Sequence, residues 1–116
     1  MMNEYDEGRI WFKKKGAVIT VGLTEKALEE IGTVQGIQLP AEGDEFTQDD
    51  VVVEIEGAKV NFEVISPADG GVVSVNEGLN DDLESLQGDP LDEGWLFKLR
   101  GAAGADGEES GDEEEV

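Results

Sequence analysis

The chain has 116 residues, a length that suits one domain with one modest hydrophobic core. It contains neither cysteine nor histidine, which excludes disulfides, thiolate nucleophiles and the commonest transition-metal ligand, and which argues against a stand-alone enzyme. The formal net charge of −21 argues against binding to nucleic acid or to anionic lipid, because both require a basic surface.

Short apolar runs separated by turn-forming residues predict strands along most of the chain. Val, Ile and Phe dominate these runs, and Gly, Asp, Asn or Pro occur between them at intervals of roughly 8–15 residues, a pattern typical of an all-β sandwich or barrel. The predicted strands are Ile10–Phe12, Ala17–Val21, Val34–Leu39, Val51–Ile55, Val60–Ile65, Gly71–Val75 and Trp95–Leu99.

One short helix is predicted within this β pattern, near residues 24–31. Thr24 can cap its N-terminus, three apolar residues follow at helical spacing, and Gly32 can end it. A second short helix is expected around Asn80–Leu86, where two acidic residues would favour the first turn through the helix dipole. The apolar stripe of the first helix comprises Ala27, Leu28 and Ile31.

Residues 102–116 differ from the rest of the chain in composition. They consist of Gly, Ala, Ser, a terminal Val and seven acidic residues, and such a segment cannot bury enough apolar surface to fold. We therefore expect a folded domain over residues 1–101, followed by a disordered acidic tail. The domain itself has 22 acidic and eight basic residues, a net charge of −14, so its partners should be basic or bind despite repulsion.

No targeting, membrane or metal signal is apparent. The first residues lack a basic segment followed by an apolar one, and no apolar run approaches the ~20 residues that span a bilayer. The acidic pairs Asp49–Asp50 and Asp81–Asp82 lack the spaced pattern of a calcium loop and are interpreted as solvated surface charge. We expect a cytoplasmic monomer with no metal site and no catalytic residue of its own.

Lys59 is the only basic residue between residues 27 and 97, a stretch that contains 18 acidic residues. The predicted strands on either side leave Glu56–Lys59 as a tight hairpin, in which Gly57 can take the positive φ that such turns often need. Lys59 would then lie at an exposed tip, where a modifying enzyme can reach its amine. A Schiff-base role would require burial, which a tip does not provide. From spacing alone, an ordinary turn lysine that offsets Glu54 and Glu56 fits equally well.

Several short blocks stand out along residues 9–100: Val21–Thr24, Ala27–Leu28, Ile31–Gly32, Leu39–Asp44, Glu56–Lys59, Ser66–Gly70, Val75–Glu77, Asp89–Pro90 and Gly94–Leu96. In their order and spacing these blocks resemble the glycine cleavage H-protein family. Glu56–Lys59 stands where the family has Glu-Ser-Val-Lys, whose lysine carries lipoate. Lipoyl-type hairpins also tend to have an acid three residues before that lysine and glycines about sixteen before and eleven after it, and Glu56, Gly43 and Gly70 fill those places.

The resemblance implies a lipoyl/biotinyl-type flattened barrel-sandwich hybrid with lipoic acid joined to Lys59 by an amide bond. Glu56, Gly43 and Gly70 would be recognised by the modifying enzyme, a lipoate ligase or a lipoyl/octanoyl transferase. Each of these residues also fits a purely structural role. The two glycines can allow the tight turns that join the halves of the fold, and Glu56 can be a solvated turn acid.

As a member of this family the protein would be a non-catalytic carrier of an aminomethyl group and reducing equivalents. Its partners would be glycine decarboxylase (P protein), aminomethyltransferase (T protein) and dihydrolipoyl dehydrogenase (L protein). Two alternatives stay open: a lipoate carrier that serves sulfur oxidation or another redox pathway, and an unmodified H-like binding module. Departures from the family pattern at Arg9–Trp11, at Gly57–Ala58 and in the acidic tail bear on which partners are recognised.

Overall fold

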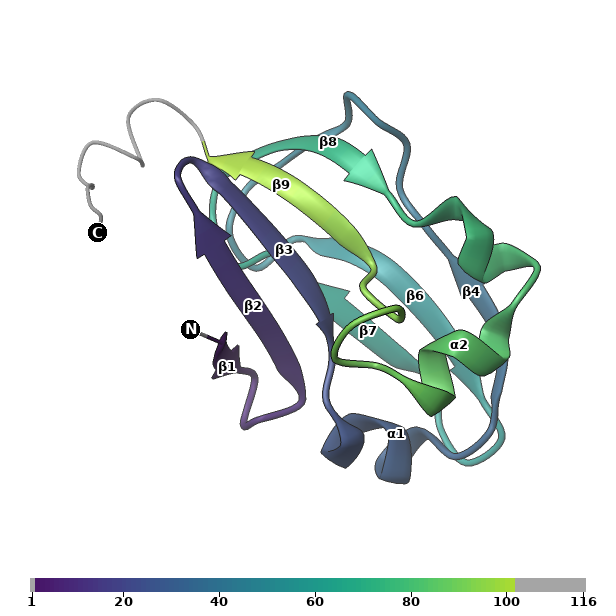
Figure 1. Cartoon of the computed structure of the whole chain (residues 1–116). Coiled ribbons are helices and arrows are strands. Elements are labelled where there is room, and N and C mark those ends of the chain that lie inside the picture. The colour runs from purple at the N-terminus through teal and green to yellow at the C-terminus, as the bar shows by residue number, and fades with distance from the viewer. Residues whose placement is uncertain (1, 102–116) are drawn as a thin grey trace.

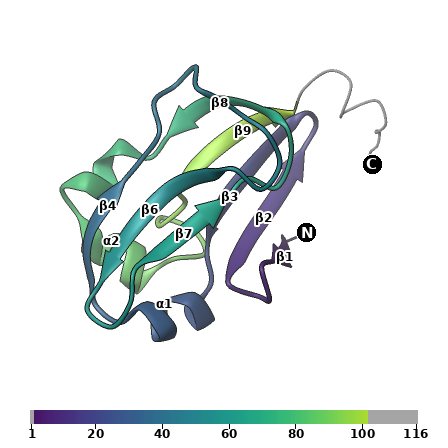
Figure 2. The same ribbon diagram turned by 180° about the vertical axis from the view of Figure 1, so that it is seen from behind.

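The computed structural model describes residues 2–101, which form two antiparallel sheets around one hydrophobic core (Figures 1 and 2). The larger sheet contains, in order across it, β1 (Met2–Tyr5), β2 (Ile10–Lys15), β3 (Val18–Leu23), β9 (Phe97–Gly101), β8 (Gly70–Val75) and β5 (Glu45–Phe46). The smaller sheet contains β4 (Val34–Gln38), β6 (Val51–Gly57) and β7 (Phe62–Ile65). Figure 2 shows the smaller sheet from its outer side. The predicted all-β fold with minor helix is confirmed.

Buried and exposed residues alternate along the strands, and the buried ones form the core between the two sheets. On β6, Val53 and Ile55 are buried, whereas Glu54 and Glu56 are exposed, as expected for a strand with one covered face. The larger sheet contributes to the same core Ile10, Ile19, Val21, Leu23, Val72, Val75, Phe97 and Leu99.

The helix α1 (Glu25–Ile31) connects the two sheets and confirms the first predicted helix. The Thr24 hydroxyl accepts a hydrogen bond from the Ala27 N–H at 3.3 Å, which caps the N-terminus. At the other end Gly32 has φ of 83° and donates its N–H to the Leu28 carbonyl at 2.9 Å. The three apolar residues of the predicted stripe are buried.

The second helix lies a few residues later than expected, as α2 (Leu83–Gly88) after the 3-10 turn η1 (Glu77–Asn80). Asp82 is its N-cap, and the Asp82 carboxylate accepts hydrogen bonds from the Ser85 N–H at 3.3 Å and the Ser85 hydroxyl at 2.8 Å. Side-chain capping fixes where this helix begins, in addition to the dipole effect that the sequence indicates.

Every predicted strand overlaps an observed one, but β1 and β5 were not predicted. The β1 sequence lacks apolar alternation, and the strand depends on tertiary contacts. The Tyr5 hydroxyl donates a hydrogen bond to the Ile65 carbonyl of β7, and the Tyr5 ring packs edge-on against Phe12 at 5.7 Å between centroids. β5 has only two residues, too few to show a pattern, and pairs with Gly70–Gly71.

No helix among residues 2–101 is long and apolar enough to cross a membrane. The acidic tail predicted over residues 102–116 lies outside the described residues.

Candidate functional site

Lys59 lies in the exposed loop that joins β6 to β7. β6 continues to Gly57, because Val34 of β4 pairs with that residue, and the loop therefore comprises Ala58–Asn61. The tight turn expected at Glu56–Lys59 is thus displaced by two residues, and Glu56 belongs to the strand. The exposed position predicted for Lys59 is confirmed.

Gly57 has a different role from the one predicted. It is not among the glycines with positive φ, so the turn does not depend on its conformational freedom. A Cβ atom at this position would instead collide with the side chain and the carbonyl of Ile31, the last residue of α1. Glycine is needed at position 57 because the end of α1 packs directly on the hairpin.

The backbone around Lys59 is fastened to the segment that follows α1. The Ala58 N–H donates to the Thr33 carbonyl at 2.9 Å, and the Lys59 N–H donates to the Ile31 carbonyl at 2.9 Å. Between these two carbonyls lies Gly32, where a Cβ atom would be only 2.9 Å from Lys59 Cγ and 3.2 Å from Lys59 N. The lysine stem therefore passes over a bare glycine, and the loop is held at two points.

The amine of Lys59 reaches the C-terminal turn of α1. Lys59 Nζ donates a hydrogen bond to the Glu29 carbonyl at 3.2 Å, in a solvent-exposed setting. Carbonyl groups in the last turn of a helix lack intrahelical partners and carry the negative end of its dipole, which suits a cation. Because this bond is exposed, it orients the amine while leaving it accessible to a second protein.

Helix α2 holds the same segment from the other side. The Gln87 amide accepts a hydrogen bond from the Val34 N–H at 3.1 Å and donates one to the Gly32 carbonyl at 3.3 Å. We call residues 31–34 the platform, since both helices and the Lys59 loop meet there. Sequence reasoning missed Gly32 and Gln87 as site residues. Gly32 was recognised only as a helix stop, and no sequence signal marked Gln87.

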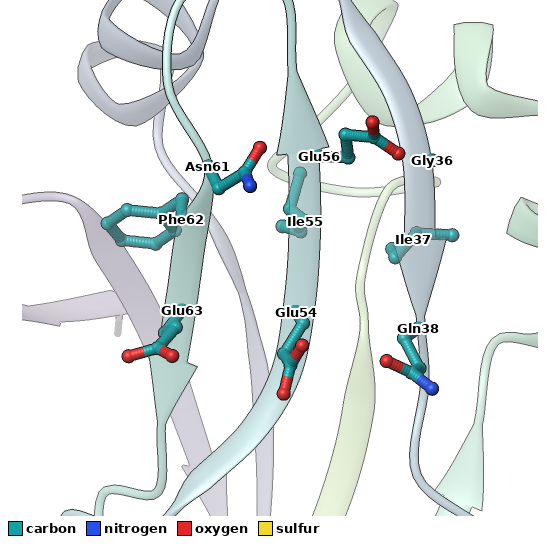
Figure 3. A pocket seen from close by; sticks show the side chains of 9 residues that line it. All are labelled: Gly36, Ile37, Gln38, Glu54, Ile55, Glu56, Asn61, Phe62 and Glu63. Carbon is teal, nitrogen blue, oxygen red and sulfur yellow. The ribbon is translucent and has the colours of Figure 1, made fainter.

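The outward face of the smaller sheet is acidic beside this loop. Glu54 and Glu63 are direct cross-strand partners on β6 and β7, and Glu56 lies closer to Lys59 on β6. A hollow of about 470 Å³ runs along these side chains. Figure 3 shows Glu56 extending towards Gly36 of β4. Among residues 2–101, none of the three glutamates forms a salt bridge. Like charges placed directly opposite each other repel, so this face favours a cationic partner.

Gly43 confirms one of the two predicted glycine turns. Its φ is 95°, it lies in the Ala41–Asp44 turn before β5, and its N–H donates to the Val72 carbonyl at 2.8 Å. No atom lies within 4 Å of a Cβ built at this position, so the backbone conformation alone explains the glycine.

Gly70 is not in a turn, contrary to expectation. It is the first residue of β8 and pairs with Gly101, and a Cβ atom there would collide with the Arg100 carbonyl. Close approach of two strands therefore requires this glycine. Glu56 lies three residues before Lys59 on the same hairpin, whereas Gly70 pairs with Gly101 at the end of β9 and the Gly43 turn contacts Val72 of β8.

The acidic pairs behave as surface groups in turns. Asp50 accepts hydrogen bonds from the Thr47 N–H at 2.8 Å and the Thr47 hydroxyl at 2.9 Å, which lowers the pKa of the Asp50 carboxyl. Within the described part of the chain, no three acidic side chains gather in a group that could hold a metal ion. The site that stands out is thus a primary amine on an exposed stem, above a backbone fixed by hydrogen bonds.

Comparison with known proteins gives a consistent result. Residues 3–115 match the family model described as glycine cleavage H-protein. The glycine cleavage system H protein of Treponema denticola is 41% identical over 96 residues, which cover 83% of this chain and 78% of that protein. The corresponding protein of Thermotoga maritima is 39% identical over 98 residues, with coverages of 84% and 79%. The crystal structure of a glycine cleavage system H protein from Mycobacterium marinum superposes with a TM-score of 0.79 at 27% identity, covering 88% of this chain and 84% of that one.

Proposed function

The chain belongs to the glycine cleavage H-protein family, and from this premise we propose that it carries lipoic acid on Lys59. It is a lipoyl carrier of the glycine cleavage system, which shuttles an aminomethyl group and reducing equivalents between the enzymes of that system. The observation that carries the assignment of the residue is the exposed Lys59 amine above the platform.

The residues around Lys59 fit an amide-linked group. Acylation removes the charge of the amine, and the only described partner that the amine would lose is the exposed Glu29 carbonyl. The backbone bonds from Ala58 and Lys59 to the platform do not involve the side chain, so they would persist after modification. When bound, the lipoyl group supplies a dithiolane whose sulfur–sulfur bond opens and closes, which allows it to hold a one-carbon unit and reducing equivalents.

The chain's own contribution is to fix the point from which the arm swings. Because two backbone hydrogen bonds hold the loop, the arm pivots about a defined position, and its effective concentration at a docked enzyme is high. The chain has no cysteine that could compete with the arm in disulfide exchange.

For the modifying enzyme, a lipoate ligase or lipoyl/octanoyl transferase, we propose recognition of Glu56. This carboxylate is exposed on β6, three residues before Lys59, and it extends into the hollow shown in Figure 3. Gly43 and Gly70 would act through the shape of the domain, since both are distant from the loop. Their backbone requirements keep β5 and β8 in place.

The proposed partners are glycine decarboxylase, aminomethyltransferase and dihydrolipoyl dehydrogenase. We propose that the chain acts as a monomeric, non-catalytic subunit that visits each enzyme in turn. The glutamates beside Lys59 would meet basic residues around the active-site entrances of these enzymes.

The modification site can be tested by intact mass after treatment with a lipoate ligase, ATP and lipoate. We expect one added lipoyl group on the wild-type chain and none on Lys59→Arg, because arginine keeps the charge but does not form the acyl amide. Lys26→Arg is the matched control, since the exposed Lys26 amine also donates to a backbone carbonyl, that of Glu7 at 2.7 Å. Normal labelling of Lys59→Arg would refute the assignment.

A further inference from the structure

Four of the eight basic side chains share the outward face of the larger sheet, near the turn between β2 and β3. Lys13 and Lys98 occupy one cross-strand row, with Thr20 between them. The next row, two residues away along the strands, holds Lys15 and Arg100 on either side of Val18. We call Lys13, Lys15, Lys98 and Arg100 the basic face.

The geometry of the strands places these charges close together. Cations in one row are separated by two strand spacings, about 10 Å, and the two rows are about 7 Å apart. Lys14 faces the other way, because its cross-strand partner Ile19 points into the core. The basic face is therefore a compact group of like charges in a chain with a large excess of acid.

No carboxylate in residues 2–101 forms a salt bridge with any of the four cations. Lys13 Nζ instead lies 5.5 Å from the centroid of the Trp11 ring, and Lys98 Nζ lies 5.2 Å from that of Trp95. Glu45 shares the row of Arg100 but is two strands away from it. The described fold thus leaves the basic face without an ionic partner, although 22 acidic residues are available within the domain.

The acidic tail begins directly beside this face. Gly101, the last residue of β9, donates its N–H to the Ala17 carbonyl at 2.9 Å, which places it next to the turn between β2 and β3 (Figure 1). Residues 102–116 follow, with seven carboxylates. We propose that residues 102–116 of the same chain occupy the basic face. This inference does not depend on the modification of Lys59.

Length and tethering favour the tail over a free anionic partner. A flexible segment of 15 residues has an end-to-end distance of about 20 Å, which exceeds the dimensions of the basic face. Attachment through a short flexible link gives an effective concentration of the order of millimolar, so a weak contact is sufficient. The contact requires no fixed conformation of the tail, in keeping with its composition. Its consequence is that the basic face is masked and the carrier presents acid on all sides to its partners.

Nuclear magnetic resonance of the full-length chain can test this contact. The reference variant keeps the tail length but replaces each of its seven carboxylates with the corresponding amide, Asp→Asn or Glu→Gln. At low salt we expect amide and side-chain shifts of the basic face, and of the Trp95 indole, to differ between wild type and this variant. The differences should disappear at 1 M salt, where the Debye length is about 3 Å.

Two single substitutions provide the matched comparison. Lys13→Gln should move the tail resonances most of the way towards those of the high-salt sample. Lys14→Gln removes the same charge from the same strand but on the opposite side of the sheet, and should leave the tail resonances nearly unchanged. Identical low-salt spectra of wild type and the amide variant would overturn the proposal. It would also be overturned by equal effects of the two lysine substitutions, or by shift differences that grow with protein concentration and so place the tail on a second copy.

Discussion

Glycine is required at position 32 for two reasons: its backbone conformation and its close contact with Lys59. Its φ of 83° is costly for any other residue, and a Cβ atom there would press on the backbone and stem of Lys59. Gly32→Ala should therefore lose about 1–3 kcal/mol from backbone strain, because φ of 83° with ψ of −156° is a conformation that only glycine adopts readily. It should also slow lipoylation severalfold, because the loop must shift away from the platform. Chemical denaturation and a ligase time course measure the two effects.

Gly16→Ala is the control for Gly32→Ala. Gly16 also has a positive φ, 62°, but nothing lies within 4 Å of a Cβ built there, at the turn between β2 and β3. It should lose a similar amount of stability and be lipoylated at the wild-type rate. Equal lipoylation of both variants would mean that the platform does not position Lys59.

Substitutions of Glu56 and Glu54 can distinguish specific recognition of Glu56 by the ligase from a general effect of negative charge. Both are exposed on the same side of β6, and either substitution by glutamine should change the free energy of unfolding by no more than ~0.5 kcal/mol. Glu56→Gln should slow the ligase, since the proposed contact is lost, whereas Glu54→Gln should not. If the two variants are labelled at the same rate, the ligase responds to overall charge and does not read Glu56.

At the scale of elements, the sequence predicts well those helices and strands that are determined by neighbouring residues, and it predicts poorly those that depend on pairing with distant segments. The cap at Thr24, the apolar stripe and the stop at Gly32 are all contained in the sequence of α1, and that helix appears where expected. The end of β6 was misplaced because Gly57 pairs with β4, a partner distant in sequence. β1 was missed for the same reason, because pairing with β2 and the Tyr5 contact to β7 make it a strand.

The same contrast between local and distant contacts holds for the candidate site. The exposed position of Lys59 and the place of Glu56 before it follow from spacing along one hairpin. The platform was not predictable, because it combines the end of α1, the hairpin loop and Gln87 from α2. Gly57 illustrates the limit well, since a glycine in an expected turn suggests conformational freedom, while the structure requires it for close packing against Ile31.

Tyr5 links the two sheets, and its ionisation gives a test of that link. Burial, assisted by the nearby carboxylates of Asp6 and Asp49, raises the pKa of the Tyr5 phenol well above its ordinary value of 10.0. The unfolded chain therefore releases this proton at lower pH than the folded one, and stability decreases as pH rises above 10. This is the only tyrosine in the chain, so phenolate absorbance reports it directly.

We expect the folded protein to show no phenolate absorbance near pH 10, and to gain it at higher pH or together with unfolding. Tyr5→Phe should be less stable at neutral pH by about 1 kcal/mol, through loss of the hydrogen bond to the Ile65 carbonyl. Its stability should fall less steeply above pH 10 than that of the wild type. Phenolate absorbance that titrates at pH 10 in the folded protein would contradict the contact of the Tyr5 phenol with β7.

At the scale of the whole molecule, the basic face and the attachment site lie on different parts of the fold. The loop of Lys59 borders an acidic sheet face, while the basic face lies near the turn between β2 and β3, beside the end of β9. A carrier must meet several enzymes without forming slow complexes. Long-range attraction by a strongly acidic surface raises encounter rates without tightening the final complex.

We expect this chain, lipoylated on Lys59, to serve glycine cleavage. The most direct measurement is release of labelled carbon dioxide from carboxyl-labelled glycine by the glycine decarboxylase of the same cell. Ligase-treated wild-type chain should support release in proportion to its lipoylated fraction, and ligase-treated Lys59→Arg should give only the background of the enzyme alone. Release by Lys59→Arg at the wild-type rate, or none with fully lipoylated wild type, would contradict the account.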